Sequence, residues 1–433
     1  MSFNTALTGL DAASKNLEVI SNNIANSNTS GFKRSRAEFA DVYAASDFGG
    51  NGTETGKGVQ VTTIRQQMTQ GDITYTDNAL DLAISGGGFF RMKDSNGGIV
   101  YSRAGMFGMD RDGYLANATE QRLTGYQVDA AGNVLPTLGE IKIDTADLQP
   151  KATENVEIGL NLDQTSEVPP VAFSVDNPKS YNFTTGSSIY DSQGSTHVVN
   201  YYFRKSNDNQ WDLYVQSADT GEMVGELDAS GDPLPYKIRF KNDGTIESIK
   251  NSDGSQTYVD NLADPAVQEP IQFTISDTAL GSSVDPIDLK LDLTSMTQYD
   301  AASGVNRVKA DGYSSGRMVS LDIDKNGIIF GRYTNGQSKA MGQVALANFS
   351  NTEGLRPVGD SAWAESYASG APAVGAPGSA SLGFIQASAL ESSNVDVTEE
   401  LVDMIGAQRA FQANAQIISV ADELTQTVIN MRR

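Results

Sequence analysis

Side chains that could do acid–base or nucleophilic chemistry are scarce in this sequence of 433 residues. It contains no cysteine, which excludes disulfides, thiolate metal sites and a cysteine nucleophile. A Ser-His-Asp triad would have to use the single histidine, His197, which lies in the strand-like run 196–201. Nothing near it resembles a nucleophile elbow, so we interpret His197 as a structural residue.

Three short motifs resemble fragments of known sites. Residues 322–327 match the first half of a calcium-binding EF-hand loop, but Tyr333 stands at the twelfth position, where a glutamate is needed. Residues 86–88 are three glycines without the Gly-Lys-Ser/Thr of a phosphate-binding loop. Asp110 and Asp112 could imitate a glycosidase pair, but 54 acidic residues produce such pairs by chance. We therefore predict a protein that is not an enzyme and needs no metal or cofactor.

The net charge of −23 bears on the choice of partners. Residues 147–310 hold 25 acidic and 11 basic residues, a net charge of −14, which argues against nucleic acid and keeps a self-associating chain soluble. No apolar stretch approaches the ~18 residues of a membrane span, so we expect no membrane insertion. The first residues lack the basic start of a Sec signal, and we expect export by a route without a cleaved signal.

Both ends of the chain carry an apolar stripe with the spacing of a coiled-coil helix. Near the N-terminus every seventh residue is apolar, and the pattern stops at Asn26 before Gly31. Near the C-terminus the same spacing runs from 396 to 431, with Asp396 and Glu399 placed as a helix cap. The stripe residues are Phe3, Leu7, Leu10, Leu17, Ile20, Ile24, Val397, Leu401, Met404, Ile405, Phe411, Ile418, Leu424 and Val428.

The region between these helices, residues 75–372, consists of short strand-like runs and tight turns. Turn signals recur at 94–97, 110–113, 129–132, 242–244 and 325–327, where Asp, Asn and Gly supply the backbone geometry of hairpin turns. The runs 198–203 and 271–275 are typical of strands. We predict a mainly β fold with α-helical termini, in which the long terminal helices form a coiled-coil-like inner layer beside two β-rich domains of barrel or sandwich type.

The expected boundaries follow these changes in pattern. Residues 1–28 and 394–433 form the helical polymerisation domain, and 29–74 and 373–393 are connecting segments. Residues 75–147 and 309–372 form an inner β-domain, and 148–308 an inserted outer β-domain. Within the connecting regions, 46–58 and 367–383 are rich in small and polar residues and are predicted to be extended or flexible.

The two terminal helices can pair with each other, but a two-helix hairpin leaves half of each apolar stripe in water. We therefore predict that helices from other copies of the chain cover the stripes. The alternative is that both helices dock on the chain's own β-domain. Head-to-tail contacts between copies that do not close into a ring produce a helical filament.

Three strings resemble parts of the flagellar rod and hook axial proteins. Residues 22–33 resemble the N-terminal signature of that family, 78–90 the start of its shared β-domain, and 393–416 its C-terminal signature. These strings bracket most of the chain. The signature residues are Asn22, Asn23, Ala25, Asn26, Gly31, Phe32, Lys33, Asn394, Val395, Asp396, Gln408, Arg409 and Asn414.

The large insertion at 148–308 resembles the outer domain of the hook members of this family. The resemblance implies a hollow, flexible helical tube that acts as a universal joint and transmits torque from the rod and motor to the filament. It also implies export by the flagellar type III system to an extracellular hook. The implied partners are further copies of the chain and the distal rod, hook cap, hook-length ruler and hook–filament junction proteins. A distal rod or other axial protein is the nearest alternative, and a secreted β-rich adhesin with helical oligomerisation ends is a more distant one.

Overall fold

A computed structural model describes residues 2–42, 56–129, 132–225, 233–250, 256–259, 270–280 and 284–431. The chain divides into two compact units. Unit 1 comprises 1–145, 319–332 and 338–433, and unit 2 comprises 146–318 and 333–337.

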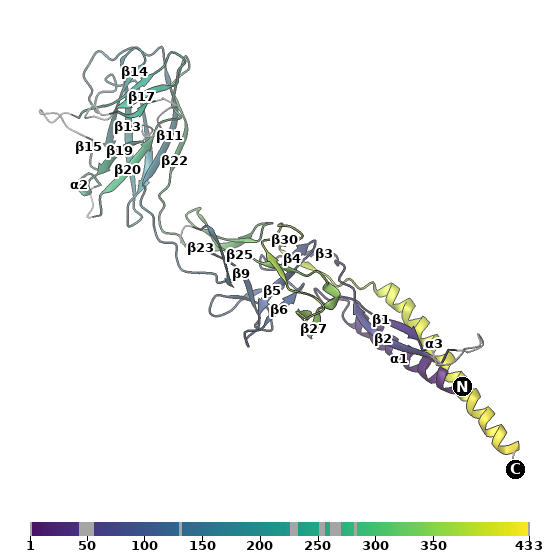
Figure 1. Cartoon of the computed structure of the whole chain (residues 1–433). Coiled ribbons are helices and arrows are strands. Elements are labelled where there is room, and N and C mark those ends of the chain that lie inside the picture. Colours follow the sequence, from purple (N-terminus) through teal and green to yellow (C-terminus); the bar gives the residue numbers. More distant parts are fainter. Residues whose placement is uncertain are drawn as a thin grey trace. The chain divides into compact units, whose positions relative to one another are not determined.

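Unit 2 is built from two sheets (Figure 1). In the described residues, one sheet has the strand order β12-β13-β14-β16-β17-β18 with β15 beside β14, and the other has the order β19-β20-β11-β21 with β22 beside β11. The elements are β11 (Asn155–Asp163), β12 (Phe183–Tyr190), β13 (Thr196–Asn207), β14 (Gln210–Ser217), β15 (Met223–Val224), β16 (Tyr236–Phe240), β17 (Ile246–Lys250), β18 (Gln256–Val259), β19 (Ile271–Ile275), α2 (Asp277–Leu280), β20 (Ile287–Asp292), β21 (Thr297–Tyr299) and β22 (Gly304–Ala310).

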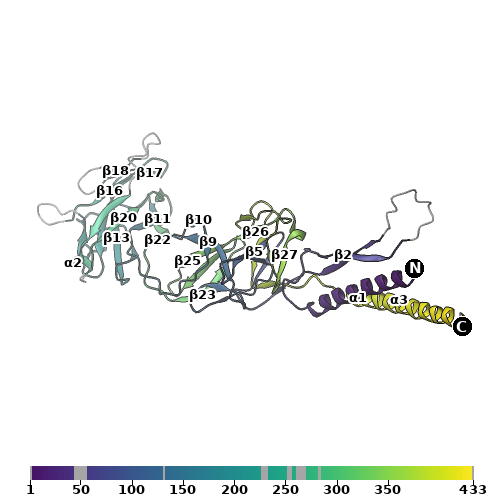
Figure 2. The same cartoon turned by 60° about the horizontal axis from the view of Figure 1, so that its bottom comes forward.

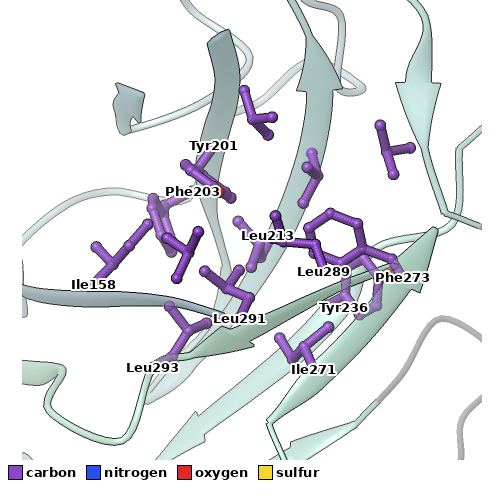
Figure 3. Packing of buried hydrophobic residues seen from close by; sticks show 14 of the residues in the cluster. Ile158, Tyr201, Phe203, Leu213, Tyr236, Ile271, Phe273, Leu289, Leu291 and Leu293 are labelled. Carbon is purple, nitrogen blue, oxygen red and sulfur yellow. The ribbon is translucent and has the colours of Figure 1, made fainter. Parts of the chain in front are cut away.

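The two sheets share one apolar core, to which both contribute alternate residues (Figure 3). In β16, Tyr236, Ile238 and Phe240 are buried while the lysine and arginine between them are exposed. In β19, Ile271 and Phe273 are buried with the same period of two. This alternation places one apolar face of each sheet against the other and gives unit 2 the architecture of a β-sandwich.

The β part of unit 1 is a large assembly of short strands, and the pairings described within it are antiparallel. Over the described residues its main sheet has the order β23-β24-β25-β9-β5-β6-β28-β27, with β7, β8, β10, β26 and β29 joined to its sides. The strands are β3 (Ile73–Tyr75), β4 (Leu82–Ser85), β5 (Phe89–Lys93), β6 (Ile99–Ser102), β7 (Gly108–Met109), β8 (Leu115–Ala116), β9 (Arg122–Val128), β10 (Val134–Glu140), β23 (Met318–Ile323), β24 (Ile328–Tyr333), β25 (Ser338–Val344), β26 (Leu346–Asn348), β27 (Arg356–Gly359), β28 (Ala362–Ala364), β29 (Ala373–Gly375), β30 (Phe384–Ala387) and β31 (Ala389–Glu391).

The helical part of unit 1 contains both ends of the chain (Figures 1 and 2). Helix α1 (Ser2–Ala25) and helix α3 (Val397–Met431) lie side by side, and α1 also contacts a hairpin of β1 (Ser35–Asp41) and β2 (Val59–Gln66). Within the described residues, neither of these helices nor α2 combines the length and apolar character needed to cross a membrane.

The prediction of a mainly β chain with helical termini is confirmed. The predicted strands at 198–203 and 271–275 lie in β13 and β19, and the turn signals at 94–97, 242–244 and 325–327 each join two strands. The turn at 129–132 and the link at 46–58 lie partly outside the described residues.

The segments expected to be connectors contain paired strands. Residues 29–74 carry β1, β2 and β3, and residues 373–393 carry β29, β30 and β31. Strand β2 is formed by residues 59–66, which are rich in β-branched side chains. Such side chains favour extended structure, and the interpretation of this segment as a connector overlooked that preference. Strands β30 and β31 pair with β4 and β3, so the C-terminal segment is built into the β part of unit 1 before α3 begins.

Candidate assembly interface

Helices α1 and α3 run antiparallel and touch along the length of α1. Asn414 of α3 lies against Gly9 of α1, so closely that a Cβ atom on Gly9 would be 2.9 Å from the Asn414 amide. At the other end, Asn23 of α1 donates a hydrogen bond to Glu400 of α3 at 3.2 Å. The signature residue Asn414 therefore packs against a glycine of the other helix, where a side chain would clash with it.

The apolar stripe of α1 is only partly covered by α3 and the β1–β2 hairpin. Ile20 is buried, and Leu10, Leu17 and Ile24 are half-buried. Phe3 and Leu7, in the first two turns, keep about half of their surface exposed, 48% and 50%. The stripe is thus covered near the β part of unit 1 and exposed to solvent toward the start of the helix.

The stripe of α3 is covered much less. Met404, Phe411 and Ile418 are half-buried toward α1, whereas Val397, Leu401, Ile405 and Leu424 are exposed. Val428 lies within α3, but its side chain is outside the described residues. Among the described side chains of α3, Glu400 and Ala407 are the buried ones. A helix of 35 residues with so little burial is stabilised poorly by its own chain.

Helix α3 also carries an apolar face of which the heptad pattern predicted only Ile405 and Leu424. Val402 and Val420 are 64% and 44% exposed, and Ile417 is 46% exposed. Positions 402 and 420 are about five full turns apart, so they point in the same direction, about 140° around the helix from buried Ala407. We name this the outer face of α3 and define it by Val402, Ile405, Ile417, Val420 and Leu424. Its signal in the sequence was the spacing of 417, 420 and 424.

Helix α3 begins at the cap that the sequence predicts. The Asp396 carboxylate accepts hydrogen bonds from the backbone N–H groups of Thr398 at 2.8 Å and Glu399 at 3.3 Å. The Glu399 side chain does not reach back to complete a capping box, because it forms an ion pair with Arg34 at 2.9 Å. Arg34 also contacts Glu400 and Asp403, and so binds the first two turns of α3 to the start of β1.

Close to the start of α3 lies a buried ionic cluster that joins segments far apart in the sequence. The Glu391 carboxylate accepts hydrogen bonds from Lys33 Nζ, from Arg103 Nη1 at 3.0 Å and from the Gly71 N–H at 3.0 Å. The side chains of Lys33 and Glu391 are fully buried. Burial lowers the pKa of Lys33, although Glu391 acts in the opposite direction. The carboxylate is shared by two cations, which compensates for much of the cost of burying them.

Two signature asparagines lie next to this cluster, and the side chain of each hydrogen-bonds to backbone N–H and carbonyl groups. Asn23 accepts from the Ser35 N–H at 2.9 Å and donates to the Ser35 carbonyl at 2.8 Å. Asn394 accepts from the Arg34 N–H at 2.7 Å and donates to the Gln67 carbonyl at 2.9 Å. We call Asn23, Lys33, Arg103, Glu391 and Asn394 the junction, because they connect both helices to the β part of unit 1.

Gly31 is a signature residue with a clear backbone reason. Its φ is +71°, and a Cβ atom there would lie 2.4 Å from the Ala104 backbone nitrogen, so only glycine fits. Asn26 donates a side-chain hydrogen bond to the Asn22 carbonyl at 2.9 Å, which closes the last turn of α1. The remaining signature residues lie outside the junction contacts: Phe32 and Val395 are half-buried, and Ala25, Gln408 and Arg409 are exposed.

The residues that could have done chemistry occupy structural positions. His197 is buried in β13, with Nδ1 2.7 Å from Asp219 and Nε2 3.1 Å from Asp191. Asp110 and Asp324 each accept backbone N–H groups within tight turns, and Asp324 closes the β23–β24 hairpin that the Asn-Gly turn predicts. Among the described residues, no group of three His, Cys, Asp or Glu side chains is placed to hold a metal ion.

Sequence reasoning missed Arg34, Arg103, Glu391 and Glu400, which lie outside the signature residues that we selected. Their partners are far away in the chain, so no local pattern marks them; Lys33 and Glu391, for example, are 358 residues apart. The signature residues Asn23, Lys33 and Asn394 lie close together at one end of the helical pair, and the stripe residues of α1 and α3 are only partly covered.

Comparisons with known proteins agree with this architecture. Four family models match in succession: the flagella basal body rod protein at 3–33, the flagellar hook protein FlgE/F/G D1 domain at 83–161, the flagellar basal body protein FlaE D2 domain at 161–313 and the flagellar basal body rod FlgEFG protein C-terminal at 386–431. These matches cover nearly all of both helices, the strands of unit 1 between 83 and 140, and the sandwich of unit 2.

Full-length relatives give the same result. The chain is 38% identical to the flagellar hook protein FlgE of Salmonella typhimurium over 100% of both chains, and 37% identical to that of Escherichia coli K12 over 100% of both. It is 32% identical to the hook protein of Borreliella burgdorferi over 99% of this chain and 98% of the relative. The structure of Helicobacter pylori flagellar hook protein FlgE2 is similar in fold, with a TM-score of 0.53 at 15% identity over 74% of this chain and 100% of that one. The chain belongs to the flagellar hook protein family and is a structural subunit of the bacterial flagellar hook.

Proposed function

We propose that the chain assembles head to tail into a hollow, flexible helical tube in which α1 and α3 of many copies form the inner layer. The observation that carries this proposal is the outer face of α3, where five large apolar side chains are 44–64% exposed in the monomer. Full burial of such a side chain is worth ~1.5–3 kcal/mol, so covering the remaining surface of this face contributes several kcal/mol for each subunit added. The coverage cannot come from α1, which occupies the opposite side of α3.

The open ends of the two helices support the same arrangement. Phe3 and Leu7 on α1 and the outer face of α3 offer apolar surface on two sides of the helical pair. A pair with two apolar surfaces binds one neighbour on each, and such heterologous contacts extend into a filament unless they close into a ring. The acidic unit 2 is well suited to an outer position, where polar surfaces can shift past each other as the tube bends.

The junction gives the tube a route for torque. Glu391, Lys33 and Arg103 connect the segments that lead into α1 and α3 to the β part of unit 1 through buried ionic hydrogen bonds. A helix joined only by a flexible link would rotate without carrying the β part with it. We propose that this fixed connection allows the hook to act as a universal joint between the rod and the filament.

The location and partners follow from membership of the family. We propose an extracellular hook reached through the flagellar type III export system, with contacts to the distal rod, hook cap, hook-length ruler and hook–filament junction proteins. The subunit has a structural role and no enzymatic one. The boundaries proposed for the outer domain, 148–308, lie inside unit 2 at 146–318.

The experiment compares two neighbouring aspartate substitutions on α3. Val420→Asp places a charge on the outer face, and Ser419→Asp places the same charge on an exposed polar side one residue away. Burying a carboxylate where a valine would pack costs more than 1.4 kcal/mol, so we expect Val420→Asp to raise the critical concentration for polymerisation by at least about tenfold. Ser419→Asp should polymerise like the wild type.

Sedimentation and negative-stain microscopy of the purified chain measure this difference. Circular dichroism confirms that both variants keep their helical content and β-structure as monomers. Tubes of normal length and yield from Val420→Asp would show that the outer face of α3 is not an interface between subunits.

A further inference from the structure

One surface of unit 1 departs from the acidic character of the chain. A groove of about 580 Å³ lies beside β5, β9 and β10 and is lined by Arg91, Lys93 and Lys142 together with the Tyr114 ring. Glu140 contributes the carboxylate in its lining. We call Arg91, Lys93, Tyr114, Glu140 and Lys142 the basic groove.

The carboxylate of the basic groove is already engaged. Glu140 accepts hydrogen bonds from Lys93 Nζ at 2.7 Å and Arg122 Nη1 at 3.0 Å, and these two hydrogen bonds lower its pKa. Arg122 also lies over the Tyr114 ring, with its guanidinium carbon 4.0 Å from the ring centroid. Glu140 is therefore engaged by Lys93 and Arg122 and does not neutralise the other two cations of the groove, Arg91 and Lys142.

Two cations in the groove have no acidic partner. Lys142 is exposed and forms no ion pair with any residue that the structure describes; its Nζ lies 5.7 Å from the Tyr114 ring centroid. Arg91 is half-buried, donates to the Thr124 hydroxyl at 3.0 Å and likewise has no carboxylate partner in the described part of the chain. The groove thus holds two surplus positive charges in a molecule of net charge −23.

The rim of the groove has the composition of a protein interface. Strand β10 exposes Val134, Leu135 and Leu138, and Leu138 lines the groove itself. In the described residues β10 pairs with β9 alone, so its other edge is open. Contiguous exposed apolar side chains mark interaction sites, and arginine and tyrosine are enriched at protein–protein contacts.

We propose that the basic groove binds an acidic segment of unit 2 from a second copy of the chain. This inference rests on the proposed polymerisation. Charge favours unit 2 as the occupant: residues 147–310 hold 25 acidic and 11 basic residues, a net charge of −14 out of −23 for the chain, and every added subunit brings that surface into the polymer. Opposite charge between groove and occupant fixes the register of the copies and speeds their docking.

Crosslinking from inside the groove tests the identity of the occupant. The chain has no cysteine, so Gln127→Cys, at an exposed lining position that leaves every cation in place, carries a single benzophenone–maleimide label. Labelled ¹⁴N subunits are polymerised with unlabelled ¹⁵N subunits and irradiated, and mass spectrometry identifies crosslinks between copies. We expect crosslinks from 127 into 146–318 of a second copy, and we expect Lys325→Cys, exposed on the β23–β24 turn, to give a different set.

A charge reversal provides the second measurement. Lys142→Glu should slow polymerisation by at least about threefold at low salt, with the difference disappearing at high ionic strength, because the contact is electrostatic. Lys325→Glu, the matched control, should polymerise at the wild-type rate.

The outcomes separate this inference from the proposed polymerisation. Tubes that form normally but crosslink from position 127 only to residues outside 146–318, or not at all, would overturn the groove assignment and leave assembly through the helices intact. A wild-type chain that forms no tubes would overturn both.

Discussion

Replacing Glu391 by glutamine removes the buried carboxylate that Lys33 and Arg103 share. The substitution keeps the size and shape of the side chain and changes its charge. The glutamine amide can still accept from the Gly71 N–H, but its NH₂ group would face a cation donor. Lys33, which is fully buried, then has no negative charge within hydrogen-bond distance among the described residues.

The expected cost follows from this uncompensated charge. Removing one partner of a buried ion pair destabilises a protein by about 3–5 kcal/mol, and the Lys33 and Glu391 side chains are as buried as a pair can be. Lys33→Met should cost less, because it leaves a balanced Arg103–Glu391 pair. The double variant should cost less than the sum of the two single variants, since the contacts are shared.

Tryptophan fluorescence can follow the two units separately, because Trp363 is buried in unit 1 and Trp211 in unit 2. In a Trp211→Phe background, Glu391→Gln should lower the urea midpoint of unit 1 by about 1–2 M at a slope of ~2–3 kcal/mol/M. In a Trp363→Phe background the midpoint of unit 2 should not move. A loss of less than about 0.3 M in unit 1, or an equal loss in both units, would refute the role assigned to the junction.

Two further substitutions test Asp311 in unit 2 and Gly31 next to the junction in unit 1. Asp311 is partly buried, which would raise its pKa, but hydrogen bonds from Asn155, Lys151 and Glu154 lower the pKa from 3.8 to about 2. The ionised Asp311 side chain therefore stabilises unit 2 fully above about pH 4, and this contribution is lost as the pH falls toward 2. After screening by solvent we expect the contribution to be ~1 kcal/mol. Urea unfolding measures it as the difference in unfolding free energy between wild type and Asp311→Asn at pH 7, and this difference should disappear at pH 2. Gly31→Ala should open residues 26–34 to proteolysis, because it combines a left-handed φ with a backbone clash, whereas Gly97→Ala, with φ +82° and open space around it, should lose only ~1–2 kcal/mol and leave that segment protected.

Sequence reasoning succeeded where the structure is set by local periodicity. The heptad spacing predicted α1 and α3 because an apolar residue on every second turn defines a helix face, and Asp396 capped α3 as expected. The Asp-Gly and Asn-Gly turns predicted hairpins because few other residues adopt a positive φ, as Gly244 and Gly327 do. The resemblance to flagellar axial proteins is confirmed by the relatives and family models.

The junction could not be predicted in this way. Asn23, Lys33 and Asn394 were selected only as signature residues, and their roles depend on partners that folding brings from the opposite end of the chain. The strands within 59–66 and 384–391 were assigned to connectors because each adjoins a stretch rich in small and polar residues, at 46–58 and 367–383. The outer face of α3 was visible as the spacing of Ile417, Val420 and Leu424, but following a single heptad register hides a second apolar face.

In the proposed assembly, the outer face of α3 is open in the monomer and covered in the tube. Because the chain has no cysteine, Val420→Cys introduces one thiol on that face. Its rate of reaction with a small maleimide, compared between dilute monomer and assembled tubes, measures coverage directly. We expect rapid labelling of the monomer and protection by at least about tenfold in the tube, as for a buried contact. Equal rates in both states would show that this face of α3 stays open after assembly.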